Sequence, residues 1–124
     1  MCNNVIGKKT WIIPDCELPP AGEGVAKGHE SVIIVNDTDT DAEINVKLFF
    51  TDRDAYEDIK WTVKAGSVRC FRTNNIDDMC GFEVPLETQY AMKLSSSCEI
   101  VVQYGRLDNT QANLAFYTTL AYTE

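Results

Sequence analysis

Strict alternation of apolar and polar residues constrains the fold of this chain more than any other feature. In residues 42–50 (AEINVKLFF) and 59–65 (IKWTVKA), every second residue is apolar over most of the segment. Successive side chains of a strand point to opposite faces, so this period of two indicates strands with one buried face. The chain must therefore build sheets that cover one another's apolar faces.

Other segments rich in β-branched and aromatic residues are separated from these by turn-forming residues, at spacings of roughly ten residues. The expected strands are 9–13, 30–36, 42–50, 59–65, 68–73, 90–96, 99–105 and 114–122. No segment shows the 3.6-residue period of a long amphipathic helix; residues 110–116 could hold one helical turn. The pattern predicts an all-β fold, an antiparallel β-sandwich of about eight strands that resembles a jelly roll.

Local composition gives finer expectations for several of these strands. Pro14 and Asp15 are expected to end the first strand, and residues 15–24, with two prolines and two glycines, to form a loop. The continuous apolar run in 30–36 predicts burial on both faces. The turn Ala65-Gly66-Ser67 predicts that 59–65 and 68–73 pair with each other.

Length and charge favour one compact, acidic domain. A chain of 124 residues with 44% hydrophobic residues can bury a core without metals or disulfides. We therefore expect a single domain over residues 1–124, with residues 1–7 as a flexible N-terminal segment. The net charge of −8, without a local basic patch, disfavours nucleic acid as a partner.

The cysteines and the apolar runs favour a cytoplasmic protein. The five cysteines are odd in number and show no C-x-x-C spacing, and the N-terminal sequence has no apolar signal segment. No run approaches the ~18 apolar residues needed to span a bilayer. We expect reduced thiols, no cofactor and no metal; a zinc site built from Cys70, Cys80 and His29 is weaker than the alternative of buried structural cysteines.

Catalytic motifs are weak in this sequence. His29 is the single histidine, and at the start of a strand it is more often a structural hydrogen-bonding group than a general base. No G-x-S-x-G is present, and the G-x-G of residues 19–28 lacks both a surrounding strand–turn–helix unit and the P-loop lysine. The acidic segment 36–43 lacks the glycine and final glutamate of an EF-hand loop. We predict that the protein is not an enzyme.

One strand runs into an unusually polar end. Residues 100–102 are β-branched, but Arg106 and Asp108 follow closely, and in an extended chain both point to the same side. They could pair with each other or cap a turn, or they could belong to a ligand or partner site. Aromatic residues beside aspartate, asparagine and arginine commonly hold sugars, although Trp and Tyr are more often core or interface residues.

Three blocks of sequence together resemble the sensory rhodopsin transducer family: residues 9–24 (KTWIIPDCELPPAGEG), 28–36 (GHESVIIVN) and 100–112 (IVVQYGRLDNTQA). The resemblance covers about residues 8–122. It implies a small β-sandwich similar to carbohydrate-binding jelly rolls, a cytoplasmic homotetramer, and a signalling or binding role without catalysis. It also implies a membrane photoreceptor as a regulator, and a DNA-binding role has been proposed for the family.

The resemblance also suggests a set of recurring polar or aromatic positions as candidates for a ligand site or an interface. They are Trp11, Asp15, His29, Glu30, Gln103, Arg106, Asp108 and Gln111. One departure is Cys16, which stands where the family usually has glycine. A positive φ at this position would strain Cys16.

Two functions from different classes therefore compete. The first is an oligomeric adaptor in signal transduction, whose acidic surface suits the basic cytoplasmic face of a membrane receptor. The second is a binding module for a small polyhydroxylated, sugar-like ligand held by His29, Glu30, Arg106 and Asp108. A DNA-binding regulator is a third and weaker hypothesis, because the negative net charge of the chain disfavours contact with DNA.

Overall fold

The computed structural model describes residues 5–22, 27–109 and 115–124, and within them it contains seven strands and no helix. The strands are β1 Lys8–Glu17, β2 His29–Asn36, β3 Ala42–Phe50, β4 Tyr56–Val63, β5 Ser67–Arg72, β6 Gln89–Asp108 and β7 Ala115–Leu120. All the strand pairs are antiparallel. The predicted all-β sandwich is confirmed.

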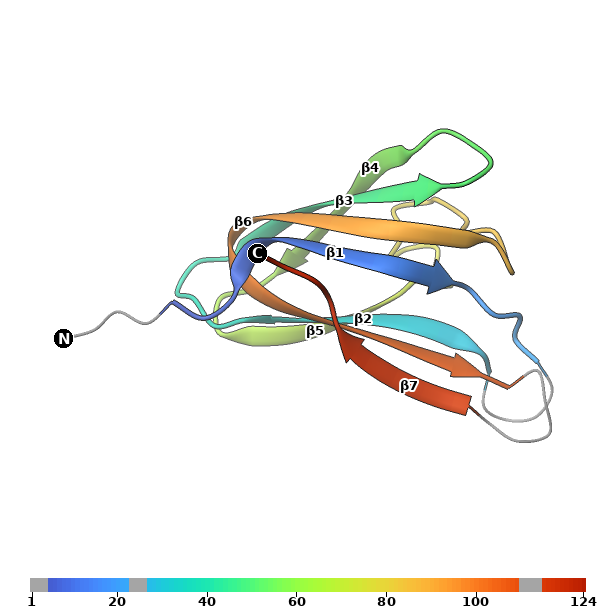
Figure 1. The fold of residues 1–124 in the computed structure, drawn as a ribbon. Coiled ribbons are helices and arrows are strands. Elements are labelled where there is room, and N and C mark those ends of the chain that lie inside the picture. The colour runs from blue at the N-terminus through green and yellow to red at the C-terminus, as the bar shows by residue number, and fades with distance from the viewer. Residues whose placement is uncertain (1–4, 23–26, 110–114) are drawn as a thin grey trace.

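The long strand β6 belongs to both layers of the sandwich (Figure 1). Its first half pairs with β1 and β3, and β4 lies outside β3; we call these four strands layer 1. Its second half pairs with β7 and β2, and β5 lies outside β2; we call these layer 2. The molecule is thus one curled sheet whose two halves face each other.

The core lies between the two layers and takes the inward residues of each strand. It includes Trp11, Ile13, Val32, Ile34, Ile44, Val46, Leu48, Ile59, Trp61, Phe71, Met92, Leu94, Ile100 and Val102. Trp61 of layer 1 stacks on Phe71 of layer 2, with ring centroids 4.2 Å apart. Burial of these alternating side chains is the main stabilising contribution of the fold.

Two of the expected strands, 90–96 and 99–105, are one continuous strand in the structure, so seven strands replace the expected eight or so. The residues between them, Ser97 and Cys98, include no proline or glycine that would break a strand. Ser97 is exposed and Cys98 is buried, which keeps the alternation through the bend. β6 can therefore pass from one layer to the other without a turn.

The prediction that 59–65 and 68–73 form a hairpin was wrong. β5 pairs with β2, from Ser31 opposite Arg72 to Asn36 opposite Ser67, and the turn after β4 carries the chain from layer 1 to layer 2. Alternation in neighbouring segments specifies that each has a buried face, but not which strand lies beside it.

The prediction that 30–36 is buried on both faces was also wrong. Val35 is 41% exposed, and its neighbour Val68 is 60% exposed on the same outer face of layer 2. The exposure of this pair shows that the apolar run of β2 reflects an open surface as well as a core.

β1 continues past Pro14 to Glu17, contrary to the expectation that Pro14 and Asp15 end it. A register shift between Ile13 and Cys16 absorbs the proline. Along its other side β1 has one isolated bridge, from Ile12 to Tyr122, and no continuous ladder that would need the N–H of Pro14. Cys16 is fully buried, and it is not among the residues with positive φ. The backbone strain that a positive φ would cause at this position is therefore absent.

Candidate functional site

A carboxylate is buried between the layers at the start of β2. Glu30 is 0% exposed. It accepts hydrogen bonds from Tyr90 Oη at 2.5 Å, Thr73 Oγ1 at 2.8 Å and the backbone N of Glu17 at 3.0 Å, and also from the hydroxyl of Tyr104. These donors come from β1, from both halves of β6, and from the segment after β5. One side chain thus fixes four parts of the chain.

A cation lies one step further out. Arg106 donates from Nε to Tyr104 Oη at 3.2 Å, and one terminal nitrogen reaches the backbone O of Asp15 at 3.5 Å. Its guanidinium carbon lies 5.4 Å from the centroid of the Tyr117 ring. Tyr104 therefore links the buried carboxylate to a half-buried cation, which offsets part of the cost of burying the charge. We call Glu30, Thr73, Tyr90, Tyr104 and Arg106 the Glu30 cluster.

The environment of the Glu30 cluster keeps two phenol groups and one thiol group protonated. Burial, followed by the negative charge of Glu30, raises the pKa of Tyr90 and Tyr104. The same two causes raise the pKa of Cys16, whose Sγ donates to the backbone O of Ile13 at 3.7 Å. The phenols therefore remain hydrogen-bond donors at neutral pH, and the thiol is not a nucleophile.

Of the candidate residues from the sequence, the structure brings together Glu30, Arg106 and Asp15. Asp15 is exposed on β1 and meets Arg106 through its carbonyl oxygen. Trp11 lies in the core instead, where its indole N donates to the backbone O of Lys8 at 2.9 Å and of Ile100 at 3.0 Å.

The other candidates lie apart from the cluster or outside the described residues. The ring of His29 bonds the backbone O of Lys27 at 2.8 Å. Gln103 pairs with Ile33 on the outer face of layer 2, and Asp108 lies at the end of β6. Gln111 lies outside the described residues.

The sequence reasoning missed Tyr90, Thr73 and the backbone N of Glu17 as partners of Glu30. Tyr90 carried a usable signal, because it shares the inward parity of Met92 and Leu94 in an alternating strand. A buried phenol needs a partner. Thr73 carried no such signal, since its position depends on the pairing of β5 with β2.

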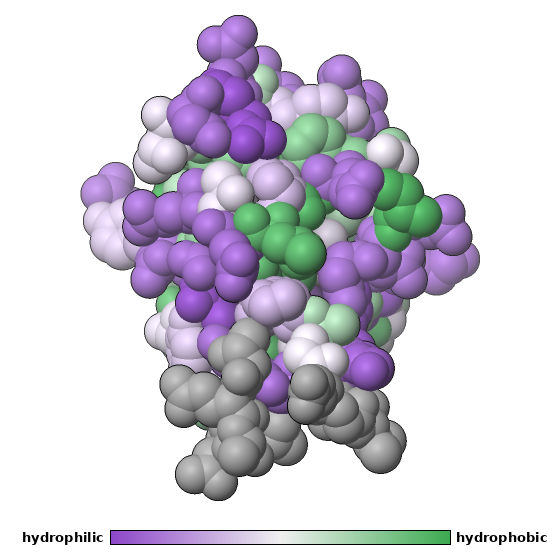
Figure 2. All heavy atoms as spheres, turned by 90° about the vertical axis from the view of Figure 1, so that its right-hand side faces the viewer, coloured by the Kyte–Doolittle hydropathy of each residue, from purple (hydrophilic) through white to green (hydrophobic). Residues whose placement is uncertain are grey.

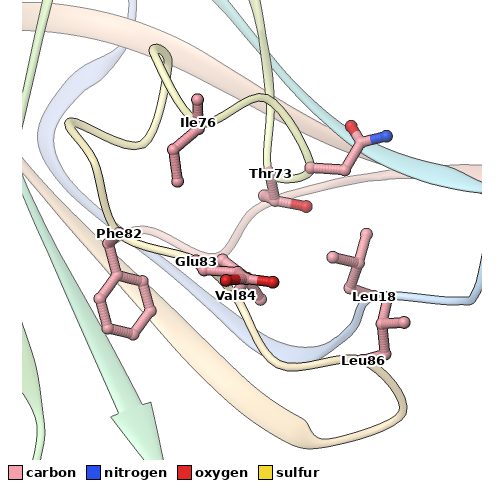
Figure 3. A pocket seen from close by; sticks show the side chains of 8 residues that line it. Leu18, Thr73, Ile76, Phe82, Glu83, Val84 and Leu86 are labelled. Carbon is pink, nitrogen blue, oxygen red and sulfur yellow. The ribbon is translucent and has the colours of Figure 1, made fainter.

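Two hollows adjoin the cluster. The β1–β7 groove, of about 430 Å³, runs between these edge strands and is lined in part by Asp15, Tyr104, Tyr117 and Tyr122. The end pocket, of about 420 Å³, is lined by Leu18, Thr73, Asn74, Ile76, Phe82, Glu83, Val84 and Leu86 (Figure 3). Within the described residues, no three His, Cys, Asp or Glu side chains are grouped to hold a metal ion.

Comparison with known proteins identifies the family. The Anabaena sensory rhodopsin transducer family matches residues 6–123. The chain belongs to this family. The solved Anabaena sensory rhodopsin transducer is 31% identical, with a TM-score of 0.70, and the likeness covers 82% of this chain and 99% of that one.

A second solved structure, that of Thermotoga maritima 1070, shows the same fold. It has a TM-score of 0.87 at 24% identity, and the likeness covers 97% of each chain. A comparison with curated proteins gives no match. The chain shares its fold with both of these structures. Its described residues include no helix long and apolar enough to cross a membrane.

Proposed function

We propose that this member of the sensory rhodopsin transducer family is a non-enzymatic cytoplasmic adaptor, which acts as a homo-oligomer and docks on the basic cytoplasmic face of a membrane receptor. The observation that carries the proposal is the family match over residues 6–123, together with the name of its solved relative, a transducer. The geometry of the described residues supports the non-enzymatic and the oligomeric parts of the proposal.

The Glu30 cluster supports a structural role better than a catalytic one. The carboxylate of Glu30 is saturated by four donors, so it has little capacity left to act as a general base. His29 bonds a backbone carbonyl, and the raised pKa of Cys16 keeps the thiol protonated. Candidate nucleophile and base are therefore not paired in the way that covalent catalysis requires.

The outer face of layer 2 supports self-association. Residues paired across antiparallel strands share a face. By the observed registers, this face carries Val68, Cys70 and Arg72 of β5, His29, Ser31, Ile33 and Val35 of β2, Val101, Gln103, Gly105 and Leu107 of β6, and Phe116, Thr118 and Leu120 of β7. Arg72 is the one charged residue of this set, although 24% of the whole chain is charged.

A second copy fits this face best. Like-charged chains of net charge −8 repel each other, and an almost uncharged face is where two copies can meet at the lowest electrostatic cost. Leu120 and Phe116 are 66% and 63% exposed on the edge strand β7, which has no lysine or proline to guard it. Four strands at ~4.8 Å spacing give a surface wide enough for face-to-face packing of sheets.

The outer face of layer 1 provides the matched control. It carries Glu43, Lys47, Lys60 and Lys93. We expect Val35→Glu in layer 2 to shift the particle to a smaller mass in light scattering, because it buries a charge in the interface. Asn45→Glu introduces the same charge on the exposed outer face of β3 and should leave the mass unchanged. A monomeric wild type, or equal masses for both variants, would overturn the oligomeric part.

The receptor is tested separately. The purified protein would be passed over membranes or nanodiscs that carry a candidate receptor, at low and at moderate salt. Attraction between the acidic chain and a basic cytoplasmic face predicts retention that weakens as salt rises. No retention at low salt by receptors encoded beside the gene would count against the adaptor role.

The β1–β7 groove supports a second candidate function, the binding of a sugar-like ligand. Its tyrosines include Tyr117 and Tyr122, which are 45% and 58% exposed, and Asp15, whose backbone O lies 3.5 Å from an Arg106 nitrogen, lines the same groove. A ligand at 100 times its Kd adds about 2.7 kcal/mol to the free energy of unfolding, which raises Tm by several degrees. A Tm shift with mono- or disaccharides that Tyr117→Ala abolishes would favour this function. If none of these sugars shifts Tm, the sugar-binding function is contradicted.

A further inference from the structure

The end pocket lies where β1 and β5 have just ended, and a long irregular loop closes it. Residues 74–88 form this loop, and the loop contributes Ile76, Phe82 and Leu86 to a mostly apolar lining (Figure 3). Ile76 is 50% exposed and Leu86 is 55% exposed. Large apolar side chains are thus presented to solvent around a hollow whose volume lies in the range of ligand sites.

The loop is strongly acidic. It contains Asp77, Asp78, Glu83 and Glu87 and no lysine or arginine, and Glu83 lines the pocket itself. Asp78 is occupied, because its carboxylate accepts a bond from the backbone N of Arg72 at 2.9 Å. The other three carboxylates are in neither of the ion pairs found within the described residues. Figure 2 shows apolar patches that polar residues surround on the end of the molecule that faces right in Figure 1.

The loop is held in one shape by the fold. The indole of Trp61 donates to the backbone O of Asp78 at 2.6 Å, and the backbone N of Glu87 donates to that of Leu18 at 2.9 Å. Met79 is buried completely. Cys80 and Glu87, the two non-glycine residues with positive φ in the described parts of the chain, both lie in this loop. Such conformations persist only where the surroundings fix them, and they gather at functional sites.

The Glu30 cluster also fixes two walls of the pocket. Thr73 lines the pocket and donates to Glu30, and Leu18 follows Glu17, whose backbone N donates to the same carboxylate. A pocket with walls that are set before binding loses less conformational entropy when it is filled. The cluster is therefore a support for the pocket rather than a site in its own right.

We infer that the end pocket takes an apolar side chain from a basic peptide segment, with lysines or arginines on both sides of that side chain paired to Glu83, Glu87 and Asp77. The inference rests on the proposed adaptor function and names the docking site for it. The apolar lining accounts for the anchor, and the excess of carboxylates accounts for the flanking charges. A second copy of this acidic chain would bring like charges to the same rim.

The probe is a short fluorescein-labelled peptide with lysines around a central leucine, followed by fluorescence anisotropy. Two companions replace the leucine by serine or the lysines by glutamine. We expect the first peptide to bind, with affinity falling as salt rises, and each companion to bind at least about tenfold more weakly. If the serine companion binds equally well, the binding is only non-specific charge attraction, and the assignment of the end pocket as the site of the leucine side chain is overturned.

Variants of the protein then locate the site. Leu86→Ala should weaken binding about tenfold, and Glu83→Gln about two- to fivefold, as expected for an exposed charge pair. Both side chains are exposed, so the fold should survive, which Tm would verify. Asp39→Asn, the same change of charge in the turn between β2 and β3 at the opposite end of Figure 1, should leave binding unchanged. Equal losses from Glu83→Gln and Asp39→Asn would overturn the assignment.

The peptide and receptor experiments fail in different ways. Receptor retention that survives Leu86→Ala and Glu83→Gln would keep the adaptor function and place its docking site elsewhere. Peptide binding at the pocket without retention by any receptor would keep the pocket and remove the membrane partner. Binding of the peptide that only the layer 2 variant Val35→Glu reduces would assign the apolar anchor to the layer 2 face instead.

Discussion

β2 carries one buried polar residue next to its first position and another at its last, and the two differ in chemistry. Glu30 and Asn36 are both 0% exposed and both face the core. Asn36 donates from Nδ2 to the backbone O of Thr40 at 2.8 Å and of Val63 at 3.0 Å. Its Oδ1 accepts from the backbone N of Thr38 at 3.0 Å and from the hydroxyl of Thr38 at 2.7 Å. Both side chains are fully hydrogen-bonded.

The partners show what each residue does for the fold. Most partners of Asn36 lie within four residues of it, so this neutral amide shapes the turn between β2 and β3. The partners of Glu30 are 13 to 74 residues away, so the carboxylate holds distant segments together. A neutral amide would cost less to bury than a charge. A charge is retained where the walls of the groove and the end pocket must be fixed.

Removal of the Glu30 carboxylate should have the largest effect on the free energy of unfolding. We expect Glu30→Ala to lower the free energy of unfolding by about 3–5 kcal/mol, because it leaves several buried donors without an acceptor and Arg106 without its counter-charge. Urea unfolding followed by tryptophan fluorescence measures the change.

Should Glu30→Ala fail to fold, Glu30→Gln gives the same information. Its amide oxygen can still accept from Thr73 and Tyr90, whereas its NH₂ group faces the backbone N of Glu17. We expect a smaller loss for glutamine than for alanine. A loss below about 1 kcal/mol for both variants would mean that the cluster is not a central support of the fold.

High pH should act on the same end of β2. The pKa values of Tyr90 and Tyr104 are raised above the ordinary 10.0 by burial and then by Glu30, so the folded state keeps protons that the unfolded state releases. Their contribution is complete below about pH 10, and stability falls as pH rises further. The two tyrosines give a slope of about 2.7 kcal/mol per pH unit, and the buried thiol of Cys16, whose pKa is also raised, adds to it.

Unfolding titrations between pH 9 and pH 12 measure this slope. Tyr104→Phe should halve the contribution of the two tyrosines, because it removes one of the retained protons. Stability that does not change up to pH 12 would contradict the buried neutral phenols. Tyr122 is the internal control, since its exposed hydroxyl bonds Glu124 and should titrate without unfolding the protein.

The fold was predictable from the sequence because it rests on a repeated local signal. Alternation in residues 42–50 and 59–65 located β3 and β4 and showed which residues face the core. Strand pairing is a non-local property, so nothing in the turn Ala65-Gly66-Ser67 could show that β5 joins β2 rather than β4. The apolar run of β2 was misread for a related reason: an uncovered face and a covered one have the same composition.

The candidate site was predictable only in part. The family resemblance pointed to Glu30 and Arg106, which the structure joins through Tyr104. It gave no indication that Glu30 is saturated, because its donors come from segments up to 74 residues away. The end pocket was not foreseen, since an acidic irregular loop in a sequence is also what a solvated connection looks like.

Removal of the Asn36 side chain should lower the free energy of unfolding less than removal of the Glu30 side chain. We expect Asn36→Ala to lower the free energy of unfolding by about 2 kcal/mol, because the buried carbonyl of Val63 and the turn lose their partner. Urea unfolding in parallel with Glu30→Ala gives the direct comparison. Binding of the lysine–leucine peptide should not change, because the turn lies at the far end from the pocket. A larger loss than that of Glu30→Ala would reverse the ranking of the two ends.

The smallest expected effect separates charge from geometry at Arg106. Lysine keeps the positive charge near Glu30 but lacks the Nε donor to Tyr104 and the planar group over Tyr117, so Arg106→Lys should lower the free energy of unfolding by about 1 kcal/mol. Arg69→Lys is the matched control: Arg69 also lies over an aromatic ring, that of Phe71 at 4.5 Å, but it is exposed and bonds only the backbone O of Thr62 among the described residues. We expect it to cost a few tenths of that amount. If the two lysine variants lose equally, Arg106 contributes only as a surface cation. A loss confined to Arg106→Lys means that the hydrogen bond through Tyr104 holds the charged end of β2 in place.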